Sequence, residues 1–330
     1  MKLQVPFVQL PLAFDAAALA AEVAAIDESH WRPHPQGFAG NSMLPLVAVE
    51  GDPGNEGFAG PMRPTPALQS CPRLSQAIAN LQATVGRTRL MRLAGEAEVT
   101  RHADQGYYWV ERVRVHLPIV TQPGVRFECG DAAVHMAAGE CWIFDTWRQH
   151  RVLNEGDASR IHLVVDTTGG AGFWELVSRG RPVPGPAGSF EPSGVALEEG
   201  RVAALACESV NVPAVMSPWE LESHLRFLFE ESVPHPSLAA AQRLAAQFLR
   251  HWRETWFECG DTVPEARARF RKLFDGFAAE AARAAGAVRL RNGMPLVEVV
   301  QVMLGRSVVA GPAVGEGTRV QEHRARGDNA

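Results

Sequence analysis

The chain lacks the sequence signatures of several protein classes. Its five cysteines are scattered and form no CxxC pair, so neither a disulfide framework nor a structural zinc site is indicated. No uninterrupted apolar run reaches the roughly 18 to 20 residues that a transmembrane helix needs. There is no lysine or arginine cluster, and the net charge is -5. We therefore expect no nucleic acid and no membrane among its partners, which leaves small molecules or proteins.

The N-terminal stretch also departs from the pattern of a secretory signal. Pro6, Pro11 and Asp15 interrupt it, and one lysine is its only basic residue before residue 26. We therefore expect a cytoplasmic protein. With 330 residues, of which 46% are hydrophobic, the chain can bury a sizeable core in one large domain or two smaller ones.

The residue pattern divides the chain into five stretches. Residues 1–86 contain an alanine-rich amphipathic helix, a Gly/Pro/Asn-rich loop and a short second helix, which we expect to pack on the core. Residues 87–178 consist of short β-branched and aromatic runs between turn residues, which predicts an antiparallel sandwich or barrel. A Pro/Gly-rich linker over 179–215 leads into helical patterns over 216–308. Residues 309–330 lack apolar periodicity and are predicted to be disordered.

Polar residues recur at every second position in several of the predicted strands. Because side chains alternate between the two faces of a strand, residues two apart point the same way. The opposite faces of these strands are apolar, as in the run Val113, Val115, Leu117 and Ile119. The pairs that point together are Arg114 with His116, Arg160 with His162, and His102 with Asp104.

Two arrangements satisfy this alternation. In the first, the polar face lies in water and the apolar face forms the core, which is the usual arrangement in antiparallel sheets. In the second, the polar face lines the interior of a barrel that holds a ligand. The alternation by itself does not decide between them.

The pair His102 and Asp104 gains significance only with a third ligand. A chain with 11 histidines and 37 acids in 330 residues has about one such pair by chance. His150 begins a later predicted strand, and Arg160 follows it. Two histidines and one carboxylate occupy one face of a ferrous ion and leave three positions for an oxo-acid and dioxygen. The planar fork of Arg160 could then pair with the distal carboxylate of that acid.

The motifs "HAD", "RVHLPIVT", "GECWIFDTWRQHRVLN" and "SRIHLVVD" are similar to those of a known family. In their order and spacing they resemble the aspartyl/asparaginyl β-hydroxylase family of iron(II)- and 2-oxoglutarate-dependent dioxygenases, which includes bacterial proline hydroxylases. The resemblance covers about residues 88–168. It implies an α+β fold with a double-stranded β-helix (jelly-roll, cupin-like) core, an N-terminal helical and loop segment and a C-terminal helical segment.

The resemblance also implies cofactors and site residues. The cofactors are iron(II), 2-oxoglutarate and dioxygen. The iron ligands of the family fall on His102, Asp104 and His150. Its 2-oxoglutarate residues fall on Arg160, for the distal carboxylate, and on His116, for the end near the metal.

The substrate is less well defined by the sequence. Arg114 is a candidate for binding a substrate carboxylate, with a solvated or structural arginine as the alternative. Asn41 and Arg63 are candidates for a substrate lid, with ordered loop packing as the alternative. Where the family can place a serine beside 2-oxoglutarate, this chain has Met91, with Thr88 and Thr100 as candidates to take over its role.

Three functions stay open at this point. The first is a 2-oxoglutarate-dependent hydroxylase acting on an aspartyl or asparaginyl residue of a peptide or protein, or on a free amino acid. The second is a metal-binding, cupin-like enzyme of another class, such as an isomerase. The third is a non-catalytic barrel that binds a ligand or partner. The C-terminal helices could cap the site or form a homodimer.

Overall fold

The computed structural model describes residues 1–186, 189–261 and 264–310. They form two compact units. The jelly-roll unit holds the described residues of 1–104 and 111–209, and the helical unit holds those of 105–110 and 210–310. Most of the tail predicted to be disordered, 311–330, lies outside the described residues. Among the described helices, none is long and apolar enough to cross a membrane.

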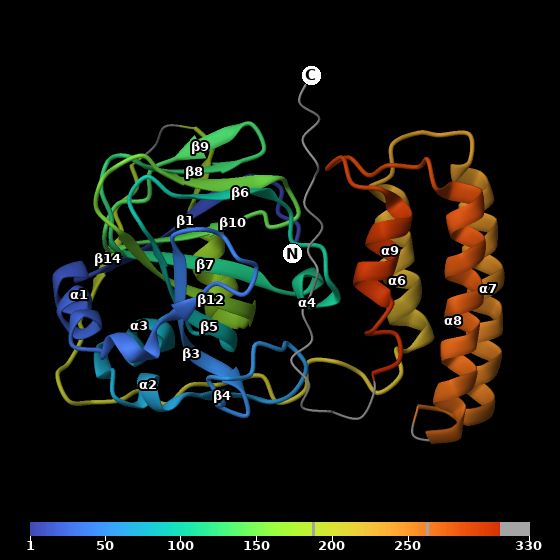
Figure 1. The fold of residues 1–330 in the computed structure, drawn as a ribbon, viewed down its shortest axis with the longest axis horizontal. Helices are drawn as coiled ribbons and strands as arrows, with labels where there is room; N and C mark the ends of the chain where they lie inside the picture. Colours follow the sequence, from blue (N-terminus) through green and yellow to red (C-terminus); the bar gives the residue numbers. More distant parts are fainter. Residues whose placement is uncertain (187–188, 262–263, 311–330) are drawn as a thin grey trace. The chain divides into compact units, whose positions relative to one another are not determined.

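Two sheets, antiparallel for the most part, build the jelly-roll unit (Figure 1). Within the described residues the larger sheet has ten strands. Their order is β13 (Arg181–Val183), β1 (Phe7–Phe14), β10 (Glu140–Phe144), β7 (Val113–Val120), β12 (Arg160–Gly169), β5 (Thr84–Leu93), β3 (Asn41–Val49) and β2 (Arg32–Pro33), with β14 (Ser193–Val195) beside β1 and β4 (Met62–Pro64) beside β3. The smaller sheet has the order β6 (Glu98–His102), β11 (His150–Asn154), β8 (Val125–Cys129) and β9 (Ala132–Val134).

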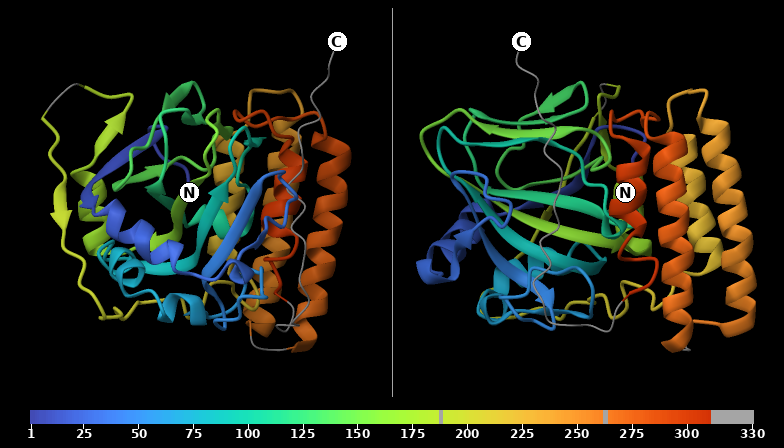
Figure 2. Two further views of the ribbon diagram at one scale, coloured as in Figure 1. Left: turned by 60° about the vertical axis from the view of Figure 1, so that its left-hand side comes forward. Right: turned by 45° about the vertical axis from the view of Figure 1, so that its right-hand side comes forward.

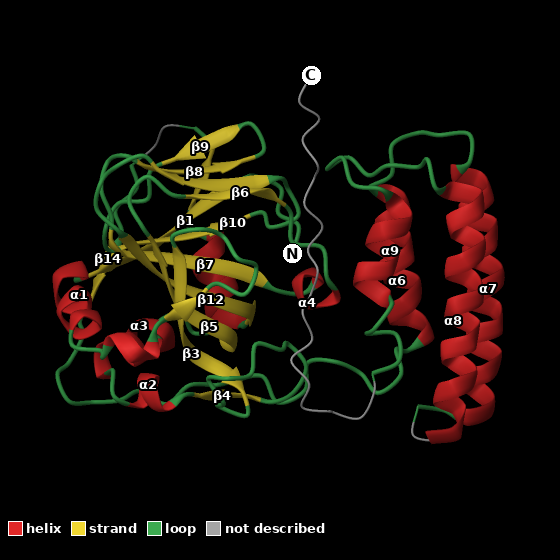
Figure 3. Cartoon of the chain, viewed as in Figure 1, coloured by secondary structure: helices red, strands yellow, loops and turns green. Residues whose placement is uncertain are grey.

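The two sheets enclose an apolar cluster drawn from both layers. Phe7 and Phe144 of the larger sheet meet Phe127 and Val152 of the smaller sheet in this cluster. Figure 3 shows the sheets as two layers of strands. This arrangement confirms the predicted α+β fold with a jelly-roll core.

The predicted strands between residues 88 and 168 are all present, and the sheet extends beyond them. β1 and β3 come from the N-terminal segment that we expected to contain helices and loops. β3 contains the buried run Leu44–Val49, which the proline at position 45 and the flanking loop residues obscure in the sequence. Such a strand can be identified only from its pairing in the sheet, and β3 pairs with β5 along most of its length.

The polar faces of the central strands point inward, which decides between the two arrangements left open by the sequence. The ring centroid of His116 lies 5.2 Å from that of Phe127 and 5.5 Å from that of Phe144. Both phenylalanines belong to the cluster between the sheets. Since directly paired residues in antiparallel strands share a face, the register places a whole group on this face. Its members are Arg114 and His116 of β7, Arg160, His162 and Asp166 of β12, and Arg87 and Arg89 of β5.

Helices bury the apolar outer face of the larger sheet. α1 (Ala16–Ala24) packs on β7, α2 (Pro66–Gln69) packs on β3, and α5 (Ala171–Ser178) packs on β1 and β12. α3 (Pro72–Ala79) lies against α1 and α2, and the short 3-10 helix Glu28–His30 precedes β2. This outer layer explains why Leu117, Leu163 and Val165 are buried although they point away from the interior.

The segment expected to be a linker, 179–215, is attached along the jelly-roll unit as far as residue 209. β13 and β14 pair with β1, and Cys207 forms a parallel bridge with Val85. The Gln76 side chain holds the backbone of Glu198 and Arg201. The proline and glycine content of this segment reflects an irregular path over the unit.

Within the described residues the helical unit has four longer helices and one short one. These are α6 (Pro218–Glu230), α7 (Leu238–Cys259), α8 (Pro264–Ala285), α9 (Leu296–Leu304) and α4 (Tyr107–Val110). Figure 2 shows α7 and α8 side by side along their length. Phe248, Trp252, Phe270 and Phe274 form aromatic contacts between them. Ser217 caps α6 by accepting a hydrogen bond from the Glu220 N–H, as the sequence predicts.

A buried ion pair anchors the end of the linker segment. Glu208 receives two hydrogen bonds from the Arg112 guanidinium, at 2.7 and 2.9 Å. Glu208→Leu leaves the arginine charge buried without its carboxylate, so we expect the free energy of unfolding to fall by about 3–5 kcal/mol. Urea unfolding followed by tryptophan fluorescence measures this loss.

The double variant Arg112→Met/Glu208→Leu is the matched control. It removes both charges and keeps apolar volume, so we expect it to recover more than half of the lost stability. A single variant that unfolds at the same urea concentration as the wild type would contradict this role of the ion pair.

Candidate metal centre

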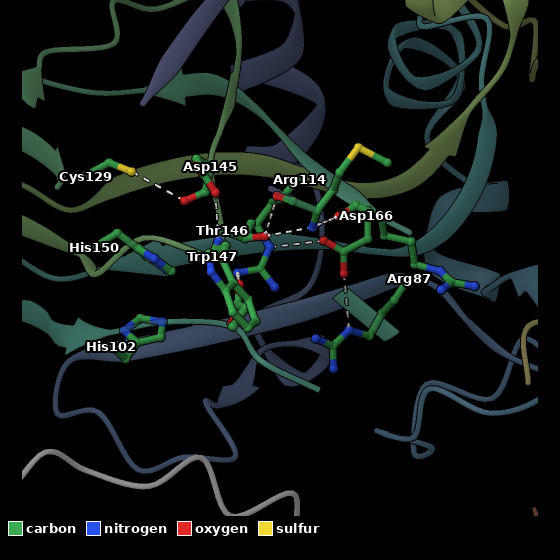
Figure 4. A network of polar contacts seen from close by, with 12 residues as sticks. Arg87, His102, Arg114, Cys129, Asp145, Thr146, Trp147, His150 and Asp166 are labelled. Carbon is green, nitrogen blue, oxygen red and sulfur yellow. Dashed lines mark hydrogen bonds and ion pairs between the residues drawn. The ribbon is translucent and has the colours of Figure 1, made fainter. Parts of the chain in front are cut away.

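Strand pairing brings the three predicted iron ligands together. His102 ends β6 and His150 begins β11, and the two residues are directly paired in the smaller sheet. Asp104 follows β6, and its N–H donates to the Thr146 carbonyl oxygen at 2.9 Å. One potential ligand atom from each of the three residues lies within 4.8 Å of the others. In Figure 4 the rings of His102 and His150 lie next to each other, and their centroids are 4.3 Å apart.

Backbone carbonyls orient both imidazole rings. Nδ1 of His102 lies 2.7 Å from the Thr100 carbonyl oxygen, and Nδ1 of His150 lies 2.9 Å from that of Arg148. Because a carbonyl oxygen can only accept, each Nδ1 carries a proton, which leaves Nε2 as the nitrogen available to a metal. This second contact is typical of histidines that ligate a metal through the other nitrogen. The donor set of two imidazoles and one carboxylate therefore fits a divalent transition-metal ion.

A chain of charges holds the carboxylate ligand from behind. Arg114 Nη1 lies 3.2 Å from Asp104 Oδ2, and Arg114 Nε donates to Asp166 Oδ1 at 3.0 Å. Arg87 Nε lies 3.7 Å from the other oxygen of Asp166. Figure 4 shows Arg114 and Arg87 on either side of Asp166. The position of Asp104 is thus fixed by an ion pair as well as by its backbone.

Burial and neighbouring charges favour the metal-binding protonation states of His150 and Asp104. Burial, with the nearby His102, lowers the pKa of His150 to about 3, so its ring is neutral at physiological pH. Burial works to raise the pKa of Asp104, but Arg114 and the two histidines outweigh it and hold the pKa below its usual value. Neutral imidazoles and an ionised carboxylate are the metal-binding forms.

A second polar group lies beside the metal-binding residues in the interior. The Arg160 side chain is buried, and its Nε and Nη1 have no hydrogen-bond partner among the described residues. Nδ1 of His116 lies 3.2 Å from Nδ1 of His162, and the Nε2 atoms of both rings are buried without a partner within the described part of the chain. Buried polar groups are usually hydrogen-bonded. This group therefore has the character of a binding site for a ligand that accepts hydrogen bonds and carries negative charge.

The structure places the other predicted residues differently. Arg114, predicted to bind substrate, contacts two aspartates of the protein. Asn41 begins β3 with its side chain buried, and it is paired with Leu93, the neighbour of Arg160 on the inward face. Arg63 lies on β4 as a largely exposed residue with an ion pair to Glu50, so it is not brought to this group.

Met91 is paired with His162 on the inward face, at the position where the family can carry a serine. Thr88 is paired with Val165, whose side chain belongs to the outer face, so its hydroxyl points away from the interior. It therefore does not replace that serine. The Met91 side chain instead packs with Met43 and Val164.

Sequence reasoning missed several polar residues of this interior. The sequence alone assigned no role in the site to Arg87, Arg89, Asp166 or His162. The period-2 pattern could have identified them. Arg87 and Arg89 lie two positions apart in β5, and Asp166 continues the series Arg160, His162 along β12. Once one residue of an alternating series is known to face inward, the others follow.

The fold is a cupin-like jelly-roll in which two histidines and an aspartate come together as candidate metal ligands. Residues 54–169, about a third of the chain, match the family model described as Aspartyl/Asparaginyl beta-hydroxylase. Over this segment the chain is similar to that family. The matched segment contains the metal-binding residues and Arg160.

Two solved structures are similar to part of the chain. An oxidoreductase of the 2OG-Fe(II) oxygenase family from Burkholderia pseudomallei is 13% identical over 48% of this chain and 81% of its own, with a TM-score of 0.36. A prolyl-4-hydroxylase from Pseudomonas putida is 16% identical over 50% of this chain and 92% of its own, with a TM-score of 0.35. At such TM-scores these similarities carry no inference about function. The search of curated proteins gives no match.

The buried histidines predict a loss of stability in acid. Burial, and next the charge of Arg160, lowers the pKa of His116 and of His162 well below the usual value. Below about pH 6.5 the unfolded chain binds protons at these rings while the folded protein does not. We therefore expect the free energy of unfolding to decrease by about 1.4 kcal/mol per pH unit for each ring as the pH falls.

Urea unfolding of the metal-free protein between pH 7.5 and pH 5 measures this slope. His162→Gln removes one of the two rings, and we expect it to reduce the slope by about 1.4 kcal/mol per pH unit. The exposed His30 provides the control His30→Gln, which should leave the slope unchanged. Equal slopes for His162→Gln and the wild type would show that the folded protein binds a proton at this ring.

Proposed function

We propose that the chain is an iron(II)- and 2-oxoglutarate-dependent dioxygenase that hydroxylates an unactivated carbon and releases succinate and CO2. His102, Asp104 and His150 would hold the iron. When bound, iron(II) with 2-oxoglutarate and dioxygen supplies the oxidising chemistry that the protein side chains lack. The proposal is supported by the ligand geometry and by the match to the hydroxylase family.

Arg160 is the observation on which the proposal depends most. A guanidinium is always charged, and burying it without an anion is costly. Burial lowers the pKa of Arg160 only to about 10, so it stays cationic at physiological pH. A carboxylate matches the fork of its donors in a bidentate pair. The distal carboxylate of 2-oxoglutarate would supply this anion.

The neighbouring residues would then have separate tasks. His116 would donate from its partnerless Nε2 side to the end of 2-oxoglutarate near the metal, with His162 fixing its ring. Arg114 would keep the Asp104 carboxylate in the orientation needed for metal binding. The rings of Phe127 and Phe144 pack around His150 and would exclude water from this side of a bound metal.

We further propose that the substrate is an aspartyl or asparaginyl residue or a free amino acid, and that it carries a carboxylate. Four arginines and two aspartates share the inward face. A divalent ion and the two carboxylates of 2-oxoglutarate offset each other, so two positive charges stay in excess. Buried charge of one sign favours a ligand of the opposite sign. The arginines are Arg87, Arg89, Arg114 and Arg160, and the aspartates are Asp104 and Asp166.

Arg89 is the residue that we expect to contact the substrate. Arg89 is buried, and it lies in the same row of the sheet as Val164 and His116. It influences His34, since burial and next the charge of Arg89 lower the pKa of His34 to about 3. His34 contacts Phe38, which in turn contacts the ring of the ligand His102. Arg89 thus lies between the proposed 2-oxoglutarate residues and the residues beside the metal.

The first test is an anaerobic titration with iron(II) and 2-oxoglutarate, followed through the weak visible charge-transfer band of the chelate. We expect the band in the wild type and no band in His150→Ala. Arg160→Met loses a charge-assisted bidentate pair, so we expect it to need at least tenfold more 2-oxoglutarate for the same band.

Arg126→Met is the matched control, because Arg126 lies on the exposed side of β8 in ion pairs with Glu128 and Glu155. It should titrate like the wild type. If the wild type is fully loaded with iron(II) and still shows no band, the oxygenase proposal is refuted. If it binds iron(II) but not 2-oxoglutarate, the alternative of a cupin-like enzyme of another reaction class is supported.

Substrate charge is tested by succinate release with a panel of free amino acids and short peptides of acidic, neutral and basic character. We expect acidic members to stimulate turnover, and we expect Arg89→Met to raise their KM about tenfold or more without changing the unstimulated conversion of 2-oxoglutarate. The control is Arg92→Met, since Arg92 lies on the opposite face of β5 and pairs with Glu28. Stimulation by basic members alone would contradict an anionic substrate.

A further inference from the structure

The segment that follows the ligand Asp104 belongs to the helical unit. Residues 105–110 group with residues 210–310, whereas Asp104 and Glu111 on either side belong to the jelly-roll unit. α4 lies in this segment and packs against α9. The segment contains both tyrosines of the chain, Tyr107 and Tyr108. The peptide bond between Asp104 and Gln105 therefore joins a proposed metal ligand directly to the helical unit.

Tyr107 ties this segment to the first turn of α6. Its hydroxyl donates to Glu220 Oε1 at 2.7 Å. The ring of Tyr107 also makes an edge contact with His224, at a centroid distance of 5.7 Å. His224 Nε2 lies 3.7 Å from the same Glu220 oxygen. One carboxylate oxygen thus holds a tyrosine of the segment and lies beside a buried histidine of α6.

Glu220 occupies the capping-box position of α6. Ser217 makes its half of the box to the Glu220 N–H, and the Ser217 backbone bonds back to the Glu220 carboxylate. The same carboxylate accepts from the Tyr107 hydroxyl. It therefore holds the start of α6 and the segment after Asp104 at once.

Both ends of the segment are fixed within the jelly-roll unit. At the start, the Asp104 N–H binds the Thr146 carbonyl oxygen. At the end, Arg112 forms the buried ion pair with Glu208 just before β7 begins. β7 then carries Arg114, which contacts Asp104, and His116. A displacement of residues 105–110 would therefore act on the carboxylate ligand through few rotatable bonds.

We infer that Tyr107 and Glu220 are positioning residues of the metal centre, through which the C-terminal helices hold the loop that continues from Asp104. The inference rests on the proposed function, since it requires that Asp104 ligates a metal. A hydrogen bond to a carboxylate is stronger than one between neutral groups. Contacts that orient a metal ligand typically change metal affinity about 10- to 100-fold when removed.

Cobalt(II) binding to the full-length, metal-free protein tests this inference without any turnover. Tyr107→Phe removes a single oxygen atom, and we expect the Kd for cobalt(II) to rise about tenfold. We also expect the visible ligand-field absorption of the saturated cobalt protein to change, because the Asp104 carboxylate is less constrained. A general loss of stability would not alter the spectrum of the fraction that binds.

Matched variants separate this role from others. Tyr108→Phe removes the neighbouring hydroxyl and should leave affinity and spectrum as in the wild type. Glu220→Gln keeps an oxygen that accepts from Tyr107 and should stay close to the wild type, whereas Glu220→Leu should reproduce Tyr107→Phe and stands in for it if that variant does not fold.

The two proposals fail in different ways. Wild-type affinity and spectrum in both Tyr107→Phe and Glu220→Leu would overturn the positioning role while leaving the metal centre intact. A wild type that binds no cobalt(II) would overturn the metal centre itself and this inference with it.

Discussion

The buried charge of Arg160 is the constraint on which the interior of the jelly-roll depends. Its Nε and Nη1 have no hydrogen-bond partner among the described residues, although burying a guanidinium without an anion is costly. The other polar groups of the interior are either paired with opposite charges or kept neutral. Arg114 bridges two aspartates, and His116 and His162 stay neutral because burial and the adjacent arginine lower their pKa values. An interior of this kind is suited to receiving a metal ion and an anionic ligand.

The same alternation that fills the interior with polar groups also stabilises the sheet from outside. Leu163 and Val165 alternate with Arg160 and His162 along β12 and are buried under the outer helices. Both faces of the larger sheet are thus covered, one by helices and one by the smaller sheet. The apolar outer layer supplies burial free energy that an interior rich in charge cannot supply. A stable scaffold can therefore carry a polar interior ready to receive a ligand.

The sequence predicted the central strands and the grouping of His102, Asp104 and His150 because period-2 alternation and motif order are local signals. It did not predict β3, whose apolar run contains a proline and is recognised only through its pairing with β5. Arg63 was drawn into the predicted site by its loop context, although the structure pairs it with Glu50. Whether the polar face of a strand points into the jelly-roll depends on which elements cover its apolar face. The sequence of the strand itself does not specify those elements.

Residues 105–110 directly follow the candidate ligand Asp104 in the chain and belong to the helical unit. The central claim, that one interior binds a metal and an oxo-acid together, is tested most directly by anomalous diffraction from crystals grown with manganese(II) and 2-oxoglutarate. We expect a metal peak between His102, Asp104 and His150, with the distal carboxylate of the ligand on Arg160. A peak at another place, or a ligand that leaves Arg160 without an anion, would contradict the account.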